Sequence, residues 1–149
     1  MLFCGSNTKE GSMGFEEFGT VSFVSQTKVD GFVHRLRQGK VSGSRCRQCG
    51  TTYFPPRADC CACMSSEMDW FDVVGEGKLV SYSTLSYAPT GFERDLPYTI
   101  GLVRFPGEVQ VFGRLSKSIE PGQVAVDMAL LVRPVMLPGN RISYEFVKP

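Results

Sequence analysis

The sequence predicts a mainly β protein in which a short N-terminal strand and a helix precede a metal-binding ribbon and a five-stranded barrel. Two observations support this prediction. The cysteines include two Cys-x2-Cys pairs, a spacing typical of zinc ribbons. After residue 75, five apolar runs alternate with turn residues, which favours a small barrel such as the OB-fold. We expect the arm and helix at residues 1–40, the ribbon at 41–72 and the barrel at 73–149.

The N-terminal part predicts an arm, one strand and one helix. Residues 1–19 are rich in Gly, Ser and Glu without clear periodicity, so we expect a flexible arm. Apolar and polar residues alternate over 20–25, which indicates a short strand. Over 28–38 the apolar residues recur at intervals of three and four, and Gly39 supplies a stop. This pattern predicts a short amphipathic helix.

The cysteine pairs carry the metal prediction. Each Cys-x2-Cys can fold as a tight turn that directs two thiolates to one point, and two such turns complete a tetrahedron. Gly50, directly after the first pair, permits the positive φ that such turns often need, and residues 50–59 suit a β-hairpin. We therefore predict one structural Zn²⁺ per chain, whose ligands are Cys46, Cys49, Cys60 and Cys63.

Two other readings of these cysteines remain open, namely a redox-active dithiol and four ordinary buried thiols. The double spacing favours metal over both. Cys61 lies inside the second pair, but the Cys60 to Cys63 spacing repeats that of the first pair, so we treat Cys61 as a bystander. Four thiolates fill the coordination sphere of zinc, and catalysis by this metal is therefore not expected.

The barrel prediction comes from five strand-like runs separated by turn signals. Pro106-Gly107, Pro121-Gly122 and Pro138-Gly139-Asn140 mark turns, and a longer loop spans 87–97. Turn residues of these types bound strands. The predicted strands are 78–85, 98–105, 109–115, 125–135 and 141–147.

Composition limits the function. The 149 residues carry sixteen basic and fifteen acidic side chains, a net charge of +1, so no strong field attracts the whole chain to nucleic acid or anionic membrane. No apolar run approaches the roughly 20 residues of a membrane span. The first residues resemble neither a secretory signal nor a transit peptide, and we expect a cytoplasmic protein.

Catalytic patterns are sparse. His34 is the sole histidine and lies in a basic segment of the predicted helix, where a solvated helix face is favoured over a catalytic role. Cys4 has no neighbouring base in sequence. Neither a nucleophile-elbow nor a phosphate-loop motif occurs. The sequence therefore predicts a chain that is not catalytic by itself.

Two segments are candidates for recognition. The loop 87–97 keeps aromatic and charged residues outside the barrel, and long loops of this kind often bind something, although these aromatics can equally fold back onto the barrel. In the ribbon, prolines beside an arginine offer a rigid, phosphate-capable surface. The candidate residues for CoA or partner binding are Tyr53, Phe54, Pro55, Arg57, Tyr87, Phe92 and Arg94.

Several motifs together resemble a known family. They are LRQGKVSGSRCRQCG, YFPPRADC, the second cysteine pair, EMDWFDVVGEGKLVSYSTL, APTGFERDLPYTIGLV, VFGRL and the terminal YEFVKP. From Phe32 onward, the chain resembles the acyl-CoA-associated proteins in which a rubredoxin-like zinc ribbon precedes an OB-fold. The resemblance implies a non-catalytic subunit bound to a thiolase-fold enzyme such as a thiolase or hydroxymethylglutaryl-CoA synthase. It also implies a role in binding or channelling acyl-CoA and in shaping the partner's active site.

Two alternatives remain beside this accessory-subunit hypothesis. One is a free-standing acyl-CoA-binding protein. The other is an OB-fold module that binds nucleic acid, for which stacked aromatics and a basic groove are usual. The predicted strands do not alternate aromatic with basic residues, and this argues against nucleic acid as the partner.

Overall fold

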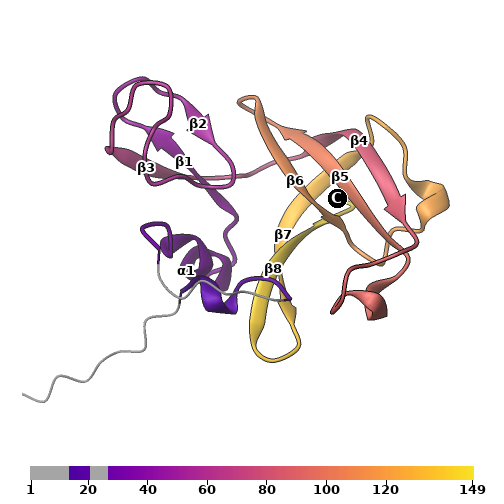
Figure 1. Cartoon of the computed structure of the whole chain (residues 1–149). Helices are drawn as coiled ribbons and strands as arrows, with labels where there is room; N and C mark the ends of the chain where they lie inside the picture. The colour runs from indigo at the N-terminus through magenta and orange to yellow at the C-terminus, as the bar shows by residue number, and fades with distance from the viewer. Residues whose placement is uncertain (1–13, 21–26) are drawn as a thin grey trace, which may run out of the picture.

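The computed structural model describes residues 14–20 and 27–149. Figure 1 shows two units side by side: a small sheet with one helix beneath it, and a barrel formed by the C-terminal half. Except for Thr20, the strand predicted at 20–25 lies outside the described residues, as do Cys4 and most of the predicted arm. Among the residues described, no helix is long and apolar enough to cross a membrane.

The helix α1 (Gly31–Arg37) is shorter than the predicted 28–38, because the residues before it form a turn. The Val29 N–H donates to the Thr27 Oγ1 at 3.1 Å, and the Thr27 N–H donates to the Asp30 Oδ1 at 3.0 Å. Such local side-chain bonds compete with helical ones. Gly39 ends the element with a φ of 83°, as the sequence predicts.

The ribbon contains a three-stranded antiparallel sheet with the order β2-β1-β3. Its strands are β1 (Ser42–Cys46), β2 (Thr52–Tyr53) and β3 (Met68–Asp72). The hairpin predicted within 50–59 is not formed there. Instead, β1 and β2 pair across the first cysteine turn, and β2 is short because Pro55 and Pro56, which come two and three residues after its end, cannot donate to a continuing ladder.

Asp72 fastens α1 to this sheet. Its Oδ1 accepts a hydrogen bond from the Ser42 hydroxyl at 2.7 Å and lies 3.3 Å from the Arg35 Nη1, while the Lys40 Nζ lies 3.5 Å from its Oδ2. The Ser42 hydroxyl and the two cations lower the pKa of the Asp72 carboxyl below its usual value. The charged form is therefore the one that the folded chain stabilises.

The substitution Asp72→Asn is expected to remove about 1 kcal/mol of stability at neutral pH. A carboxyl with a lowered folded-state pKa contributes stability above its unfolded pKa, about 3.9, and loses it as pH falls through the folded pKa. The urea midpoints of variant and parent should therefore differ at pH 7 and converge below pH 3. Asp59→Asn, at an exposed residue, is the control, and an equal deficit at all pH values would contradict the assignment.

The C-terminal half is a closed five-stranded barrel with the order β4-β5-β6-β8-β7. Neighbouring strands are antiparallel except β6 and β8, which are parallel, and β4 closes the barrel against β7. This is the OB-fold expected from the sequence. The strands are β4 (Gly77–Leu85), β5 (Tyr98–Phe105), β6 (Val109–Leu115), β7 (Ala129–Leu137) and β8 (Arg141–Val147).

Four of the five strands begin within one residue of the predicted position, whereas β7 starts at Ala129 rather than 125. Residues 125–128 form a turn instead. The Met128 N–H donates to the Ala125 carbonyl at 3.3 Å, and Asp127 has a φ of 68°, a conformation that interrupts a strand. The short helix η3 (Pro121–Gln123) precedes this turn.

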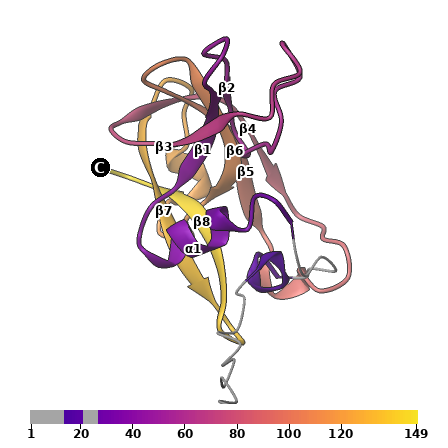
Figure 2. The same cartoon turned by 90° about the vertical axis from the view of Figure 1, so that its left-hand side faces the viewer.

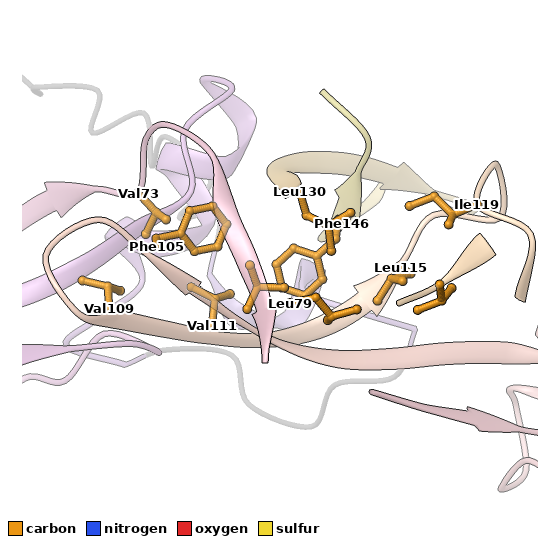
Figure 3. Close-up of a cluster of buried hydrophobic side chains, with 11 residues drawn as sticks. Val73, Leu79, Phe105, Val109, Val111, Leu115, Ile119, Leu130 and Phe146 are labelled. Carbon is orange, nitrogen blue, oxygen red and sulfur yellow. The ribbon is translucent and has the colours of Figure 1, made fainter. Parts of the chain in front are cut away.

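Inward-facing side chains of the five strands fill the barrel (Figure 3). Leu79, Val103, Val111, Leu130 and Phe146 are fully buried, and the alternating burial of β5 and β6 shows the period of two that the sequence predicts. An irregularity interrupts β4, where Val80 is inserted between residues that pair with consecutive positions of β5. This β-bulge marks the point at which β4 leaves β7.

A second apolar cluster joins the two units. Phe32, Val33 and Leu36 of α1 are buried with Ile142 of β8, and Figure 2 shows α1 lying against β8. The ring of Phe54, from the ribbon, packs edge-on against Phe32 and Tyr144, at centroid distances of 6.1 and 5.5 Å. The ribbon, the helix and the barrel therefore share one core region, which we call the junction cluster.

The described N-terminal residues pair with the first residues of β8. After the short helix η1 (Phe15–Glu17), Phe18 forms a parallel bridge with Ile142, and the Gly19 N–H donates to the Ile142 carbonyl at 2.8 Å. The Arg141 Nη2 donates to the Phe18 carbonyl at 2.9 Å. This segment therefore adds to β8 where β6 no longer pairs with it.

Candidate metal centre

The two cysteine pairs fold as equivalent turns. In the first, the Gly50 N–H donates to the Cys46 carbonyl at 3.0 Å, and in the second the Met64 N–H donates to the Cys60 carbonyl at 2.9 Å. Gly50 and Met64 have φ values of 75° and 62°. Both turns therefore close four residues after their first cysteine, with a left-handed residue at the same position.

These turns bring four thiols together. The Sγ atoms of Cys46, Cys49, Cys60 and Cys63 all lie within 4.8 Å of one another, and the Cys46–Cys63 and Cys49–Cys60 pairs are 3.5 Å apart. A tetrahedral metal bound to thiolates at about 2.3 Å would separate the sulfurs by about 3.8 Å. The four residues that the sequence singles out are therefore positioned to bind one metal ion.

Neighbouring hydroxyl groups favour the thiolate form of two cysteines. The Tyr53 hydroxyl lies 3.1 Å from the Cys60 Sγ and lowers the pKa of that thiol to about 6. The Thr51 hydroxyl lies 3.1 Å from the Cys49 Sγ and lowers the pKa of Cys49. Because a metal binds the thiolate, Tyr53 and Thr51 are suited to orient and support the ligands.

Cys61 is exposed and is not one of these four residues. Its Sγ lies 3.5 Å from the Tyr53 hydroxyl, so it contacts the surroundings of the site without joining the sulfur cluster. His34 is also exposed, and its Nε2 lies 2.9 Å from the Gln38 side-chain amide one helical turn away. Both residues lie where the sequence analysis expects them, beside the metal site and on a solvated helix face.

The equivalent turn positions give a matched pair of variants. Met64 is 83% exposed, so Met64→Gly removes the steric cost of a left-handed side chain without opening a cavity, and it should stabilise the metal-loaded chain by about 0.5–1 kcal/mol. Gly50→Ala should destabilise it by about 1 kcal/mol, although an added Cβ would contact nothing within 4 Å. Thermal melting compares the two variants, and shifts of the same sign would contradict the backbone explanation.

The ribbon residues predicted for recognition surround a cavity between ribbon and barrel. This cavity, of about 360 Å³, is lined by Tyr53, Phe54, Pro55 and Arg57 from the ribbon and by the β5–β6 turn. The Arg57 guanidinium stacks over the Tyr53 ring, 5.3 Å from its centroid. Phe54 differs from the others because its ring also packs against Phe32 and Tyr144 of the junction cluster.

The loop residues predicted for recognition are placed differently from one another. Tyr87 is 75% exposed and Arg94, in the short helix η2 (Glu93–Asp95), is exposed. Phe92 is half-buried and lines a groove of about 410 Å³ on the outside of the barrel. The structure therefore places Phe92 in a concave surface and leaves Tyr87 and Arg94 exposed to solvent.

Most of this groove comes from outward-facing residues that the sequence analysis does not single out. Ile100, Phe112, Val135 and Leu137 contribute apolar side chains from β5, β6 and β7, and Phe18 forms part of the groove wall. Phe112 is 59% exposed. The sequence signal for these groove residues is an apolar side chain at an outward-facing strand position. Reading that signal requires knowing which positions of the strand face outward, that is, the strand register.

Comparisons with known proteins agree with this architecture. A model of the ChsH2 rubredoxin-like zinc ribbon domain matches residues 33–69, and a model of the ChsH2 C-terminal OB-fold domain matches residues 70–134. Among solved structures, the Ltp2-ChsH2(DUF35) aldolase aligns with a TM-score of 0.70 at 21% identity, covering 83% of this chain and 97% of that one. At this identity the alignment shows a shared fold.

Two curated relatives are similar in sequence. A DUF35 domain-containing scaffold protein of Methanocaldococcus jannaschii is 35% identical over 74 residues, and the match spans only about half of each protein, 49% of this chain and 52% of the relative. The benzoylsuccinyl-CoA thiolase subunit BbsA of Thauera aromatica is 28% identical over 113 residues, 72% of this chain and 76% of BbsA. The two ChsH2 domain models match adjacent segments, in the order ribbon then OB-fold, and together they span more than half of this chain. The chain therefore belongs to the ChsH2 family of proteins that join a rubredoxin-like zinc ribbon to an OB-fold.

Proposed function

We propose that this chain is a non-catalytic accessory subunit of a thiolase-fold acyltransferase complex. The observation that carries the proposal is its similarity to BbsA, a named thiolase subunit, across three quarters of that protein. The thiol cluster is consistent with it, because a four-thiolate site has no open position for substrate. In this role the chain binds an enzyme that acts on acyl-CoA and helps to hold the acyl-CoA substrate.

We further propose that the metal is a structural zinc ion, one per chain. Four sulfur donors in a tetrahedral arrangement are typical of Zn²⁺ or an iron centre, and the matching domain model is that of a zinc ribbon. The ribbon sheet is small and β2 has only two residues. Metal binding therefore supplies much of the free energy that orders this unit.

The two concave surfaces are candidates for the acyl-CoA and its enzyme. At the 360 Å³ cavity, Arg57 offers a guanidinium to a phosphate beside the Tyr53 ring. The 410 Å³ groove is mostly apolar and offers Phe92 to an acyl group or to a partner side chain. Pro55 lines the first of these surfaces, and the exposed Tyr87 and Arg94 are further candidates for contact with the partner.

The test is to isolate the tagged chain from its native host and to identify and quantify the proteins and metal that co-purify. A stoichiometric thiolase-fold subunit and about one zinc per chain would support the proposal. Recovery of the chain alone would contradict it. Titration of that isolated chain with CoA esters would then show whether it is a free-standing acyl-CoA-binding protein.

A further inference from the structure

The strand β4 has one edge that pairs only over its first residues. On one side, β4 pairs with β5 from Lys78 to Leu85. On the other, it pairs with β7 only at Gly77 and Lys78, and Leu79 adds bonds to Met128 and Asp127. No strand of the described residues pairs with this side of residues 81–85, which we call the free edge.

The hydrogen-bond alternation shows which backbone groups face this free edge. The Leu79 N–H and C=O bond to Met128 and Asp127, away from β5. Alternate residues of an antiparallel strand face opposite edges, and the inserted Val80 shifts the alternation by one. Ser81 and Ser83 therefore face β5, while Tyr82 and Thr84 direct their backbone groups to the free edge.

The contact between Thr84 and Thr99 agrees with this alternation. Their hydroxyl oxygens are 2.9 Å apart, and Thr84 lies directly opposite Thr99 in the β4–β5 ladder. Side chains approach most closely at non-hydrogen-bonded pairs. Thr84 therefore has its N–H and C=O available on the side away from β5.

Apart from the bulge at Val80 that precedes it, the free edge carries neither the charges nor the prolines that usually prevent strand addition. Natural edges carry Lys, Pro or inward-pointing charges, but no charged residue occurs between Lys78 and Glu93, and the first proline is Pro89. Tyr82, within the free edge, is 43% exposed, and the flanking Val80 and Tyr87 are 36% and 75% exposed. Figure 1 shows this part of β4 on the side of the barrel away from the ribbon.

We propose that the free edge of β4 binds an extended, uncharged segment of the enzyme partner, which adds to the barrel as a further strand. Main-chain bonds to Tyr82 and Thr84 would hold that segment, and the Tyr82 side chain would pack against it. The inference rests on the proposed function, because it requires a partner subunit.

A partner segment fits this edge better than a second copy of the chain. Two copies paired only through five-residue edges would bury far less than the roughly 1,200 Å² of a stable interface. A segment of a subunit that is bound elsewhere as well avoids this limit, because its effective concentration is high. The free edge is therefore one part of a larger interface.

Amide hydrogen exchange at single-residue resolution tests the proposal. In the full chain alone, the Tyr82 and Thr84 amides should exchange at least tenfold faster than those of Ser81 and Ser83, which serve as internal controls. In the complex recovered from the native host, the two fast amides should slow at least tenfold. Slow exchange in the isolated chain, or no protection in a complex that contains a thiolase-fold subunit, would overturn the free-edge inference alone. Failure to recover any such subunit would contradict the proposed function and this inference together.

A pair of variants at one position gives a second readout. Thr84→Pro removes the N–H at the free edge and keeps the β5 ladder, since a proline is tolerated at an edge. Thr84→Val keeps that N–H, and both variants lose the hydroxyl contact with Thr99. Provided that both melt within a few degrees of the parent, we expect Thr84→Pro alone to weaken subunit binding at least tenfold. Equal affinities of the two variants for the recovered subunit would contradict the proposal.

Discussion

Replacing Cys46 or Cys60 with serine is expected to abolish stoichiometric metal binding and to unfold the ribbon. Both residues are buried, and a serine hydroxyl is a poor replacement for a thiolate. Structural zinc sites contribute about 10–16 kcal/mol of apparent binding free energy in small domains, so loss of one ligand removes most of the support for a sheet this small. Metal analysis should fall from about one ion per chain to near zero.

Cys61→Ser is the matched control for this result. Cys61 lies next to Cys60, and the sulfur atoms of both contact the Tyr53 hydroxyl. The Cys61 sulfur is not one of the four clustered thiols. This variant should keep its metal and its melting temperature. Loss of metal in Cys61→Ser, or full retention in Cys46→Ser, would show that the ligand set is different.

The substitution Phe32→Ala should destabilise the whole chain by about 3–5 kcal/mol, the usual cost of removing a buried aromatic ring. Phe32 is 2% exposed and is surrounded by the rings of Phe15, Phe18, Phe54 and Tyr144. The cavity would open where helix, ribbon and barrel meet. Urea unfolding with probes in both units should show their transitions separating.

Phe112→Ala is the control for size and chemistry, because this ring is 59% exposed on the outside of the barrel. Its stability should change by less than about 1 kcal/mol. If Phe32→Ala lowers only the stability of the helix and leaves a single unchanged transition for the barrel, the junction cluster does not couple the two units.

The sequence correctly predicts those features that depend on the spacing of residues close together in the chain. The two Cys-x2-Cys pairs predict the four clustered thiols, since each turn needs only a few consecutive residues. Alternation of apolar and polar residues and the Pro-Gly turns predict the barrel strands. The predicted start of β7 is wrong because Asp127 adopts a left-handed conformation where its N–H bonds to the Leu79 carbonyl of β4. The pattern of one strand contains no information on such a contact.

Long-range contacts explain what the sequence did not predict. In the sequence, Phe54 stands beside two prolines and is a candidate recognition residue, yet its ring packs between Phe32 and Tyr144. The groove joins outward-facing residues of several strands with Phe18 from the N-terminal segment. Neither assignment can be made before the strand order and the position of α1 are known.

The junction cluster also constrains the order in which this protein can mature during synthesis. α1 is made early, whereas Ile142 and Tyr144, against which it packs, belong to the last strand. Until β8 has been synthesised, the apolar face of α1 is covered only in part, by Phe15, Phe18 and Phe54, and the barrel lacks the strand that joins β6 to β7. Nascent chains therefore expose part of this apolar face until β8 forms, a period in which a chaperone or an early-binding subunit would protect it from aggregation.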